Sequence, residues 1–294
     1  MNQQSGAENW WARGTVERMP VAGVERDVFV RVAGSGPTLT LLHGYPASSL
    51  EWAGLWDAFT GRCRTLAVDF LGFGRSDKPH RHRYRLDEQA ELVRHVWQSH
   101  NVERTTIVAY DYGAIIAQLL LTDRAARDRV ERVIFLNGGM YPELYRPRRI
   151  QTLALNPVLG PLLWKTTSER TFARSWTAIF GPEHKPAAEL VHQHWLAASH
   201  GDPGTEALRR LLFYIPDRAA RAATLTATLT GPTPLSFLWG CADPVAGAPI
   251  ARALRQRIPD IDLVEYPDLG HCPHLEAPDR VGPDILARLP QPGA

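Results

Sequence analysis

Short apolar runs alternate with longer amphipathic stretches over the first half of the chain. The apolar runs predict buried strands, and stretches such as residues 86–100, whose apolar positions recur at helical spacing, predict helices. Strands that alternate with helices in this way indicate a mostly parallel sheet with helices on both faces. The predicted strands of this half are residues 16–21, 27–32, 38–42, 64–70, 106–110 and 133–136.

The alternation is interrupted in the second half of the chain. From about residue 140 to about residue 229 the pattern is helical, rich in aromatic residues and broken by prolines, without clear strands. Predicted strands return at residues 234–239 and 263–266. Because ligands of open α/β sheets bind at the carboxyl ends of the strands, we interpret the interruption as a lid over that edge. The predicted parts are a core of residues 14–139 and 230–294 and a helical lid of residues 140–229.

The composition is that of an ordinary globular protein. Of the 294 residues, 44% are hydrophobic and 22% are charged, which is typical of a chain with a sizeable core. A formal net charge of +2 is too small to indicate a nucleic-acid or membrane partner. The chain shows no apolar run long enough for a membrane span, no signal-peptide pattern and no paired cysteine spacing. We therefore expect a cytoplasmic protein, and these features leave its oligomeric state open.

Asp111 occupies the most informative position in the chain. It stands between the predicted strand 106–110 and the apolar helical run 115–121, with Gly113 two residues later. Strand, sharp turn and helix form the context of a nucleophile elbow, in which most chains carry Ser. The simpler alternative is that Asp111 caps the following helix.

A carboxylate at that position limits the chemistry. Attack by Asp111 on an acyl carbon would give an anhydride, which reverts more easily than it proceeds. Attack on an sp³ carbon with a leaving group gives an ordinary ester, which water can cleave at its carbonyl. Asp111 therefore argues against an esterase or a peptidase and for displacement at an alkyl electrophile.

Two partners for Asp111 follow later in the chain. Asp243 comes just past the predicted strand 234–239, and His271 follows the strand 263–266 after a glycine. Nucleophile, acid and histidine in this chain order are expected of an α/β-hydrolase. We expect His271, oriented by Asp243, to activate a water that attacks the ester carbonyl of Asp111.

The tetrahedral intermediate of that step needs an oxyanion hole. The candidates are the backbone N–H groups of Tyr45, which follows a His-Gly step, and of Tyr112, which follows Asp111. No metal or cofactor is expected. His192 and His194, separated by one residue, would point to different faces of a helix and do not form a ligand pair.

With these motifs in place, the chain resembles the α/β-hydrolase superfamily over nearly its full length. Within it, the chain is similar to the aspartate-nucleophile branch of epoxide hydrolases and haloalkane dehalogenases, and more closely to proteins of the mesoderm-specific transcript type. The resemblance implies an α/β-hydrolase fold, with an eight-stranded, mostly parallel sheet, helices on both faces and an inserted helical lid. The residues that carry the closer resemblance are 110–113, 136–139, 141–143, 179–182 and 212–215, with Arg218.

The resemblance leaves two kinds of enzyme open, of which the first is an epoxide hydrolase. Epoxide hydrolases use lid tyrosines to protonate the opening ring, because the leaving alkoxide stays attached to the substrate. Tyr214 lies at the spacing before Asp243 that is typical of one such tyrosine. Where the other is expected, the chain has Leu159 and Trp164 instead. The residues that could substitute are Tyr45, Tyr141 and Tyr145.

The second kind of enzyme is a haloalkane dehalogenase, which needs N–H donors around the departing halide. Dehalogenases generally use a Trp after the nucleophile, with a lid Trp or an Asn after the His-Gly step. This chain has Tyr112 and Tyr45 at two of those positions, and Trp164 is the one candidate donor. An epoxide hydrolase that produces a vicinal diol is therefore favoured.

The predicted site combines residues from the core and the lid. The aromatic lid predicts an apolar pocket and a small apolar substrate. A non-catalytic binding or signalling protein on the same scaffold is the alternative of another class, and the joint presence of the acid, the base and the nucleophile argues against it. The predicted catalytic residues are Asp111, His271, Asp243 and Tyr214, and the predicted substrate contacts are Tyr45, Tyr112, Tyr141 and Trp164.

Overall fold

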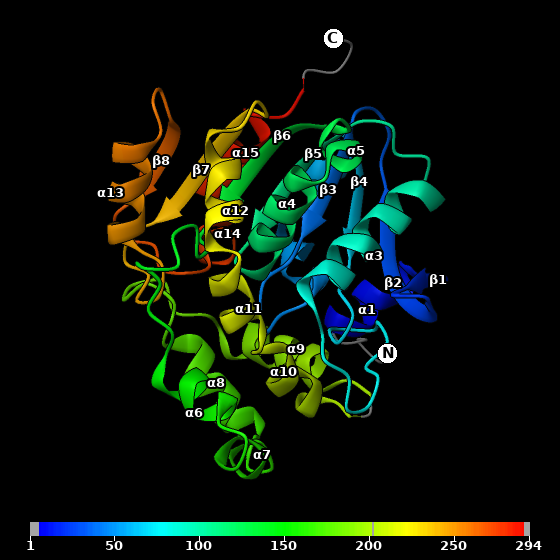
Figure 1. The fold of residues 1–294 in the computed structure, drawn as a ribbon, viewed down its shortest axis with the longest axis vertical. Coiled ribbons are helices and arrows are strands. Elements are labelled where there is room, and N and C mark those ends of the chain that lie inside the picture. The colour runs from blue at the N-terminus through cyan, green and yellow to red at the C-terminus, as the bar shows by residue number, and fades with distance from the viewer. Residues whose placement is uncertain (1–5, 202, 291–294) are drawn as a thin grey trace.

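An eight-stranded sheet forms the centre of the computed structural model, which describes residues 6–201 and 203–290 (Figure 1). The strand order is β1-β2-β4-β3-β5-β6-β7-β8. β2 is antiparallel to both of its neighbours, and the other pairs are parallel, which confirms the predicted mostly parallel sheet. The strands are β1 (Thr15–Val21), β2 (Val24–Ala33), β3 (Thr38–Leu42), β4 (Arg64–Val68), β5 (Thr105–Tyr110), β6 (Val130–Leu136), β7 (Leu235–Gly240) and β8 (Asp262–Tyr266).

The middle of the sheet is buried on both faces. Every residue of β5 is buried, and its sequence from Ile107 to Tyr110 is a continuous apolar run rather than an alternating one. In the register, Leu41 of β3 pairs with Ala67 of β4 on one side and with Val108 of β5 on the other. The edge strand β1 instead has both exposed and buried positions. The apolar runs of the sequence thus mark the strands that are covered by helices.

Helices cover both faces of this sheet. α3 and α4 pack side by side in front of it in Figure 1, and α15 lies behind it. α3 is amphipathic, with Leu92, Val93 and Val96 among its buried residues. The core helices are α1 (Gly6–Ala12), the 3-10 helix η1 (Ser49–Leu55), α2 (Trp56–Thr60), α3 (Leu86–Ser99), α4 (Tyr112–Thr122), α5 (Arg124–Arg127), α13 (Ala248–Arg257), α14 (Pro273–Glu276) and α15 (Pro278–Leu286).

The segment between β6 and β7, residues 137–234, is called the insertion below. Its described residues form helices and no strand, as the sequence pattern indicates. The helices are α6 (Arg149–Leu155), α7 (Leu159–Trp164), α8 (Glu169–Thr177), α9 (Ala188–Ser199), α10 (Thr205–Leu211), α11 (Tyr214–Ala220), α12 (Ala222–Ala227) and η2 (Thr228–Thr230).

The insertion lies at one end of the sheet. Helices α6 to α11 are grouped beyond that end, at the bottom of Figure 1. The division of the chain at residues 140 and 229 stays a prediction. Among the residues that the structure describes, no helix is both long and apolar enough to cross a membrane.

Candidate active site

Asp111 lies in the tight turn between β5 and α4. Its φ of 45° is in the left-handed region, which is uncommon for a residue other than Gly. The turn also requires Gly113, because a Cβ there would lie 2.3 Å from the backbone oxygen of Leu42. The Asp111 side chain makes no capping bond to α4, so the simpler interpretation as a helix cap does not hold. The carboxylate instead lines a cavity.

Asp111, Asp243 and His271 lie side by side, although the sequence separates them widely. His271 Nε2 is 3.2 Å from Asp111 Oδ2, and His271 Nδ1 is 2.6 Å from Asp243 Oδ2. All three side chains are buried. They follow β5, β7 and β8, whose carboxyl ends meet at one edge of the sheet. The structure therefore brings together the three residues predicted to form the catalytic triad.

Burial and charge act in opposite directions on the pKa values of this group. Burial lowers the pKa of His271, but the negative charges and hydrogen bonds of Asp243 and Asp111 outweigh it and raise the pKa to about 10. Burial raises the pKa of Asp243, but the charge and hydrogen bond of His271 lower it overall, together with hydrogen bonds from Asn137 and the Val245 N–H. The raised pKa of His271 favours a protonated imidazole ring between the side chains of Asp243 and Asp111.

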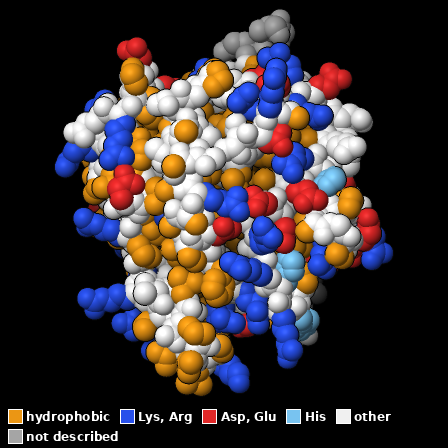
Figure 2. Space-filling model, in the orientation of Figure 1, with side chains coloured by type: hydrophobic (Ala, Val, Ile, Leu, Met, Phe, Trp, Pro, Cys, Tyr) orange, Lys and Arg blue, Asp and Glu red, His pale blue; other side chains and the backbone are white. Residues whose placement is uncertain are grey.

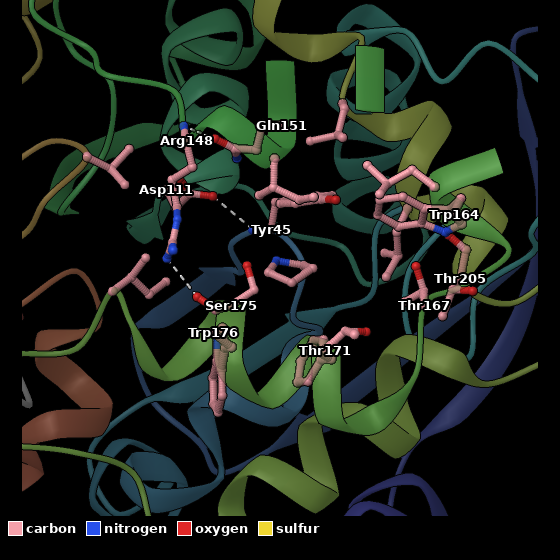
Figure 3. A pocket seen from close by; sticks show the side chains of 18 of the residues that line it. Tyr45, Asp111, Arg148, Gln151, Trp164, Thr167, Thr171, Ser175, Trp176 and Thr205 are labelled. Carbon is pink, nitrogen blue, oxygen red and sulfur yellow. Dashed lines mark hydrogen bonds between the residues drawn. The ribbon is translucent and has the colours of Figure 1, made fainter. Parts of the chain in front are cut away.

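The backbone holds one oxygen of Asp111. The Tyr45 N–H donates to Asp111 Oδ1 at 2.9 Å (Figure 3). His43 braces the Tyr45 loop, since its Nε2 accepts a hydrogen bond from the Phe70 N–H at 3.1 Å. The Tyr112 N–H as a second oxyanion donor stays a prediction. Oδ2 of Asp111 is thus the oxygen that faces His271.

Two tyrosine hydroxyls meet in the same cavity as Asp111. The hydroxyl oxygens of Tyr145, in the loop before α6, and of Tyr214, the first residue of α11, are 3.1 Å apart. Both residues line the cavity. Burial raises the pKa of Tyr145 to about 12 and that of Tyr214 well above its usual range. Both are therefore neutral phenols that can donate a hydrogen bond.

A buried guanidinium lies beside this tyrosine pair. Arg218 is 2% exposed, and its central carbon lies 4.0 Å from the centre of the Tyr145 ring. Its positive charge opposes the burial that raises the pKa values of Tyr145 and Tyr214. Gly139 leaves the space for it, because a Cβ at Gly139 would lie 1.7 Å from Arg218 Nη1. Arg218 is thus placed to act on both hydroxyls through its charge.

These groups line a cavity of about 230 Å³ (Figure 3). Its core side contains Asp111 and His271, and most of its other walls come from the insertion. Arg148 is the only Lys or Arg in the described lining, and its Nη1 donates to the Ser175 backbone oxygen at 2.7 Å. The apolar residues of the walls include Leu163, Phe172, Trp176, Trp195, Leu208 and Leu212. The cavity therefore suits a molecule that is largely apolar.

Comparison with known sequences assigns this chain to a family. The profile of the alpha/beta hydrolase family matches residues 41–283. The chain belongs to that family. The hydrolase named LipZ of Mycobacterium tuberculosis is 37% identical over 268 residues, which cover 89% of this chain and 92% of LipZ. The human mesoderm-specific transcript homolog protein is 34% identical over 260 residues, which cover 85% of this chain and 77% of that protein.

Solved structures share the fold of this hydrolase. The epoxide hydrolase CorEH has a TM-score of 0.76 at 21% identity, over 93% of this chain and 98% of that one. The haloalkane dehalogenase DatA of Agrobacterium tumefaciens has a TM-score of 0.74 at 21% identity, over 97% and 98% of the two chains. These comparisons confirm the predicted superfamily, and at such identities the structures show the fold alone.

Two side chains predicted to contact the substrate lie outside the cavity of this hydrolase. The Tyr112 ring is fully buried and packs edge-on against Phe70 and Tyr214, with ring centres 5.5 Å and 5.2 Å away. The Tyr141 ring lies beneath Arg257, whose central carbon is 4.4 Å from the ring centre. Each ring is thus used for packing away from the cavity, and its contact with a substrate stays a prediction.

Tyr45 and Trp164 do line the cavity, as the sequence led us to expect. The Trp164 indole N–H already donates to the backbone oxygen of Thr205 (Figure 3). This N–H group is therefore already hydrogen-bonded and is not available to donate to a ligand in the cavity. Within residues 6–201 and 203–290, no group of three or more His, Cys, Asp and Glu side chains is placed to hold a metal ion.

The sequence motifs assign no role to Asn137, which holds the Asp243 side chain in place. Its Nδ2 donates to Asp243 Oδ2 at 2.9 Å and to the Gly240 oxygen at 2.8 Å. Its Oδ1 accepts the Gly240 N–H at 2.6 Å. Asn137 thus ties the end of β6 to the end of β7. In the sequence, this role is indicated by a polar residue that directly follows a buried strand.

Glu276 also lacked a predicted role, and it secures the loop that carries His271. Its carboxylate accepts the N–H groups of Gly270 at 2.7 Å and of Gly181, in the insertion, at 2.8 Å. The His271 N–H donates to the Ile179 oxygen at 2.8 Å. The position of His271 therefore depends on contacts with the insertion as well as on the sheet.

Proposed function

We propose that this hydrolase opens an epoxide through an ester on Asp111 and then hydrolyses the ester to a vicinal diol. The observation that carries the proposal is the pair of hydroxyls of Tyr145 and Tyr214, 3.1 Å apart in the cavity that Asp111 lines. The leaving oxygen of an epoxide stays attached to the substrate and needs a proton donor. Two neutral phenols meet that need.

In the first step, Asp111 attacks a ring carbon. Because Oδ1 accepts the Tyr45 N–H, Oδ2 is the attacking oxygen. The ring C–O bond breaks, and the ring oxygen takes a proton from the tyrosine pair. The tyrosinate that remains lies close to the positive charge of Arg218, which stabilises it. The product is a neutral ester between Asp111 and the opened substrate.

Formation of the ester changes the charge around His271. The ester replaces one of the two carboxylates that raise the pKa of His271, so this pKa falls. The imidazolium passes its proton to the tyrosinate, which restores the phenol. Asp243 still accepts the hydrogen bond from Nδ1 and keeps the ring oriented. Alkylation of Asp111 thereby converts His271 into a general base.

In the second step, His271 takes a proton from a water whose oxygen attacks Cγ of Asp111. The oxyanion develops at Oδ1, where the Tyr45 N–H already donates. Collapse breaks the ester bond to the substrate, and the proton left on the added water oxygen passes to the leaving alkoxide, which releases the diol. The Asp111 carboxylate and the His271 imidazolium are restored. The balance is one epoxide and one water consumed for each diol.

A haloalkane dehalogenase would use the same carboxylate and the same base. A departing halide, however, needs N–H donors rather than a proton. The Trp164 N–H is engaged by Thr205, and the Tyr112 ring lies outside the cavity lining. These two observations favour the epoxide over the haloalkane.

Intact-protein mass spectrometry on His271→Gln tests the proposal. This variant should form the ester and stall, because the base of the second step is missing. Offered epoxides and bromoalkanes of matched carbon skeletons, it should gain the mass of a whole epoxide. The double variant with Asp111→Asn should gain nothing, and the distant His192→Gln should turn over without accumulating an adduct.

Two other outcomes would contradict the proposal. An adduct formed only from the bromoalkanes, with loss of bromide, would make the protein a dehalogenase. The absence of any adduct from either series would favour a non-catalytic binding protein on a hydrolase scaffold.

A further inference from the structure

Exposed apolar side chains are concentrated on α6, α7 and the loop between them. Figure 2 shows an apolar cluster at the lower end of the molecule, where Figure 1 places α7. Single exposed apolar residues are ordinary, but a cluster marks an interaction surface. We call the cluster the apolar tip: Ile150 (39% exposed), Leu153 (48%), Val158 (77%), Leu159 (49%) and Leu162 (66%).

The surroundings of the apolar tip are positively charged. Residues 144–168 contain four basic residues and no Asp or Glu, whereas the whole chain is nearly balanced, with 33 basic and 31 acidic residues. Arg146, Arg149 and Lys165 are exposed, and Lys and Arg side chains lie around the tip in Figure 2. Apolar side chains flanked by cations are the combination with which helices bind at anionic lipid surfaces.

The same two helices also form part of the cavity wall. Ile150 on α6, and Leu163 and Trp164 on α7, line the cavity that contains Asp111. The neighbouring side chains of the apolar tip are exposed to solvent instead. A lipid surface in contact with the tip would therefore be separated from the cavity by two short helices only.

We propose that the apolar tip docks on a membrane surface that contains anionic lipids, and that a lipophilic substrate enters the cavity from that surface. A stable interface with another protein buries about 800 Å² on each partner. A projecting tip of five side chains with flanking cations fits shallow insertion among lipid headgroups better. The docking itself does not depend on which reaction the cavity performs.

Flotation with vesicles of phosphatidylcholine alone, or mixed equally with phosphatidylglycerol, tests the docking. The protein should bind the mixed vesicles more strongly than the neutral ones. Leu159→Glu with Leu162→Glu should weaken binding at least about tenfold, because it places charge where apolar contact is needed. Arg149→Gln with Lys165→Gln should weaken binding to mixed vesicles roughly 25-fold, at about fivefold for each charge lost.

A matched control uses two exposed valines on the edge strand β1 and on its neighbour β2. Val16→Glu with Val24→Glu adds the same charge at side chains that are 50% and 48% exposed on β1 and β2. This variant should bind vesicles as the unaltered protein does. Equal loss in the control would show that net charge, rather than the apolar tip, controls the binding.

Two further results would overturn the proposal. The first is failure of the unaltered protein to bind the mixed vesicles. The second is a dimer in light scattering that Leu159→Glu with Leu162→Glu dissociates, because the tip would then be the contact between two copies of the chain. Neither measurement requires turnover, so failure of the proposed epoxide reaction would leave the docking result standing.

Discussion

The two sides of the cavity are built differently. On the core side, Asp243 is held by Asn137 and by the Val245 N–H, and Asp111 is held by the Tyr45 N–H. On the insertion side, α6 and α7 are only seven and six residues long and expose apolar side chains. The carboxylates thus follow strands of the sheet, and most other groups of the cavity wall belong to helices of the insertion. The tyrosine pair brings two hydroxyls from the insertion into the cavity that Asp111 lines.

The largest effect should come from breaking the core side at Asp111. Asp111→Ala removes the attacking oxygen, so diol formation should fall by at least about 10⁴-fold. Product formation from an epoxide measures the loss, and circular dichroism checks that the variant is folded. Activity retained near the original rate would show that Asp111 is not the nucleophile. The proposed division of roles between the core side and the insertion side of the cavity would then be wrong.

Tyr214→Phe tests the contribution of the insertion side to the chemistry. Loss of the hydroxyl should slow opening of an epoxide by about 10²-fold, the usual size of a general-acid contribution. Displacement of bromide should be unaffected, because bromide leaves without a proton. The rate of adduct formation in a His271→Gln background measures both, with Tyr145→Phe as the companion variant. Equal slowing of both substrates would reduce Tyr214 to a packing residue.

Asn137→Ala tests how far the core side depends on its hydrogen bonds. It leaves the Asp243 carboxylate and two backbone groups of Gly240 without their partner, which should cost about 1–3 kcal/mol of unfolding free energy. Because Asp243 orients the base, hydrolysis of the ester should slow roughly tenfold, and more than its formation. Denaturant unfolding and a build-up of the ester during turnover check the two effects. An unchanged stability would contradict the role assigned to Asn137.

A smaller effect is expected at Arg218. Arg218→Gln removes the positive charge that opposes burial, so the pKa values of Tyr145 and Tyr214 should rise further. Weaker acids donate less readily, and epoxide opening should slow roughly fivefold. Carbon NMR of the tyrosine rings follows the pKa values without any substrate, and Arg218→Lys should restore most of the rate. Unaltered titrations would show that Arg218 acts through packing only.

The smallest expected effect is a dependence of stability on pH. The pKa of His271 is raised from 6.5 to about 10 in the folded protein. Its stabilising contribution is therefore complete below pH 6.5 and is lost as the pH rises towards 10. The melting temperature should decline over that window by a few degrees more than in His271→Gln. Parallel curves for the two proteins would mean that the imidazolium contributes nothing to the fold.

The positions of Asp111, Asp243 and His271 could be predicted from the sequence because each follows a recognisable strand. Asp111 comes after a fully buried strand, and Asp243 and His271 come after two later strands. The directions of two other predicted side chains could not be predicted in this way. Tyr112 and Tyr141 lie in suitable places along the chain, but the direction of each ring depends on its packing against residues far away in the sequence.

Local patterns of apolar and polar residues determined the sheet, its helices and the tight turn at Asp111, because burial and turn geometry are recorded in neighbouring residues. The meeting of Tyr145 and Tyr214, which are 69 residues apart, was decided only by the tertiary structure. The tertiary structure also decided the hydrogen bond of Asn137 to Asp243, across 106 residues. It likewise brought the side chains of the apolar tip together on one surface. The helical pattern of the insertion does not record how its short helices pack against one another and against the core. Their contacts therefore become visible only when the whole chain has folded around the sheet.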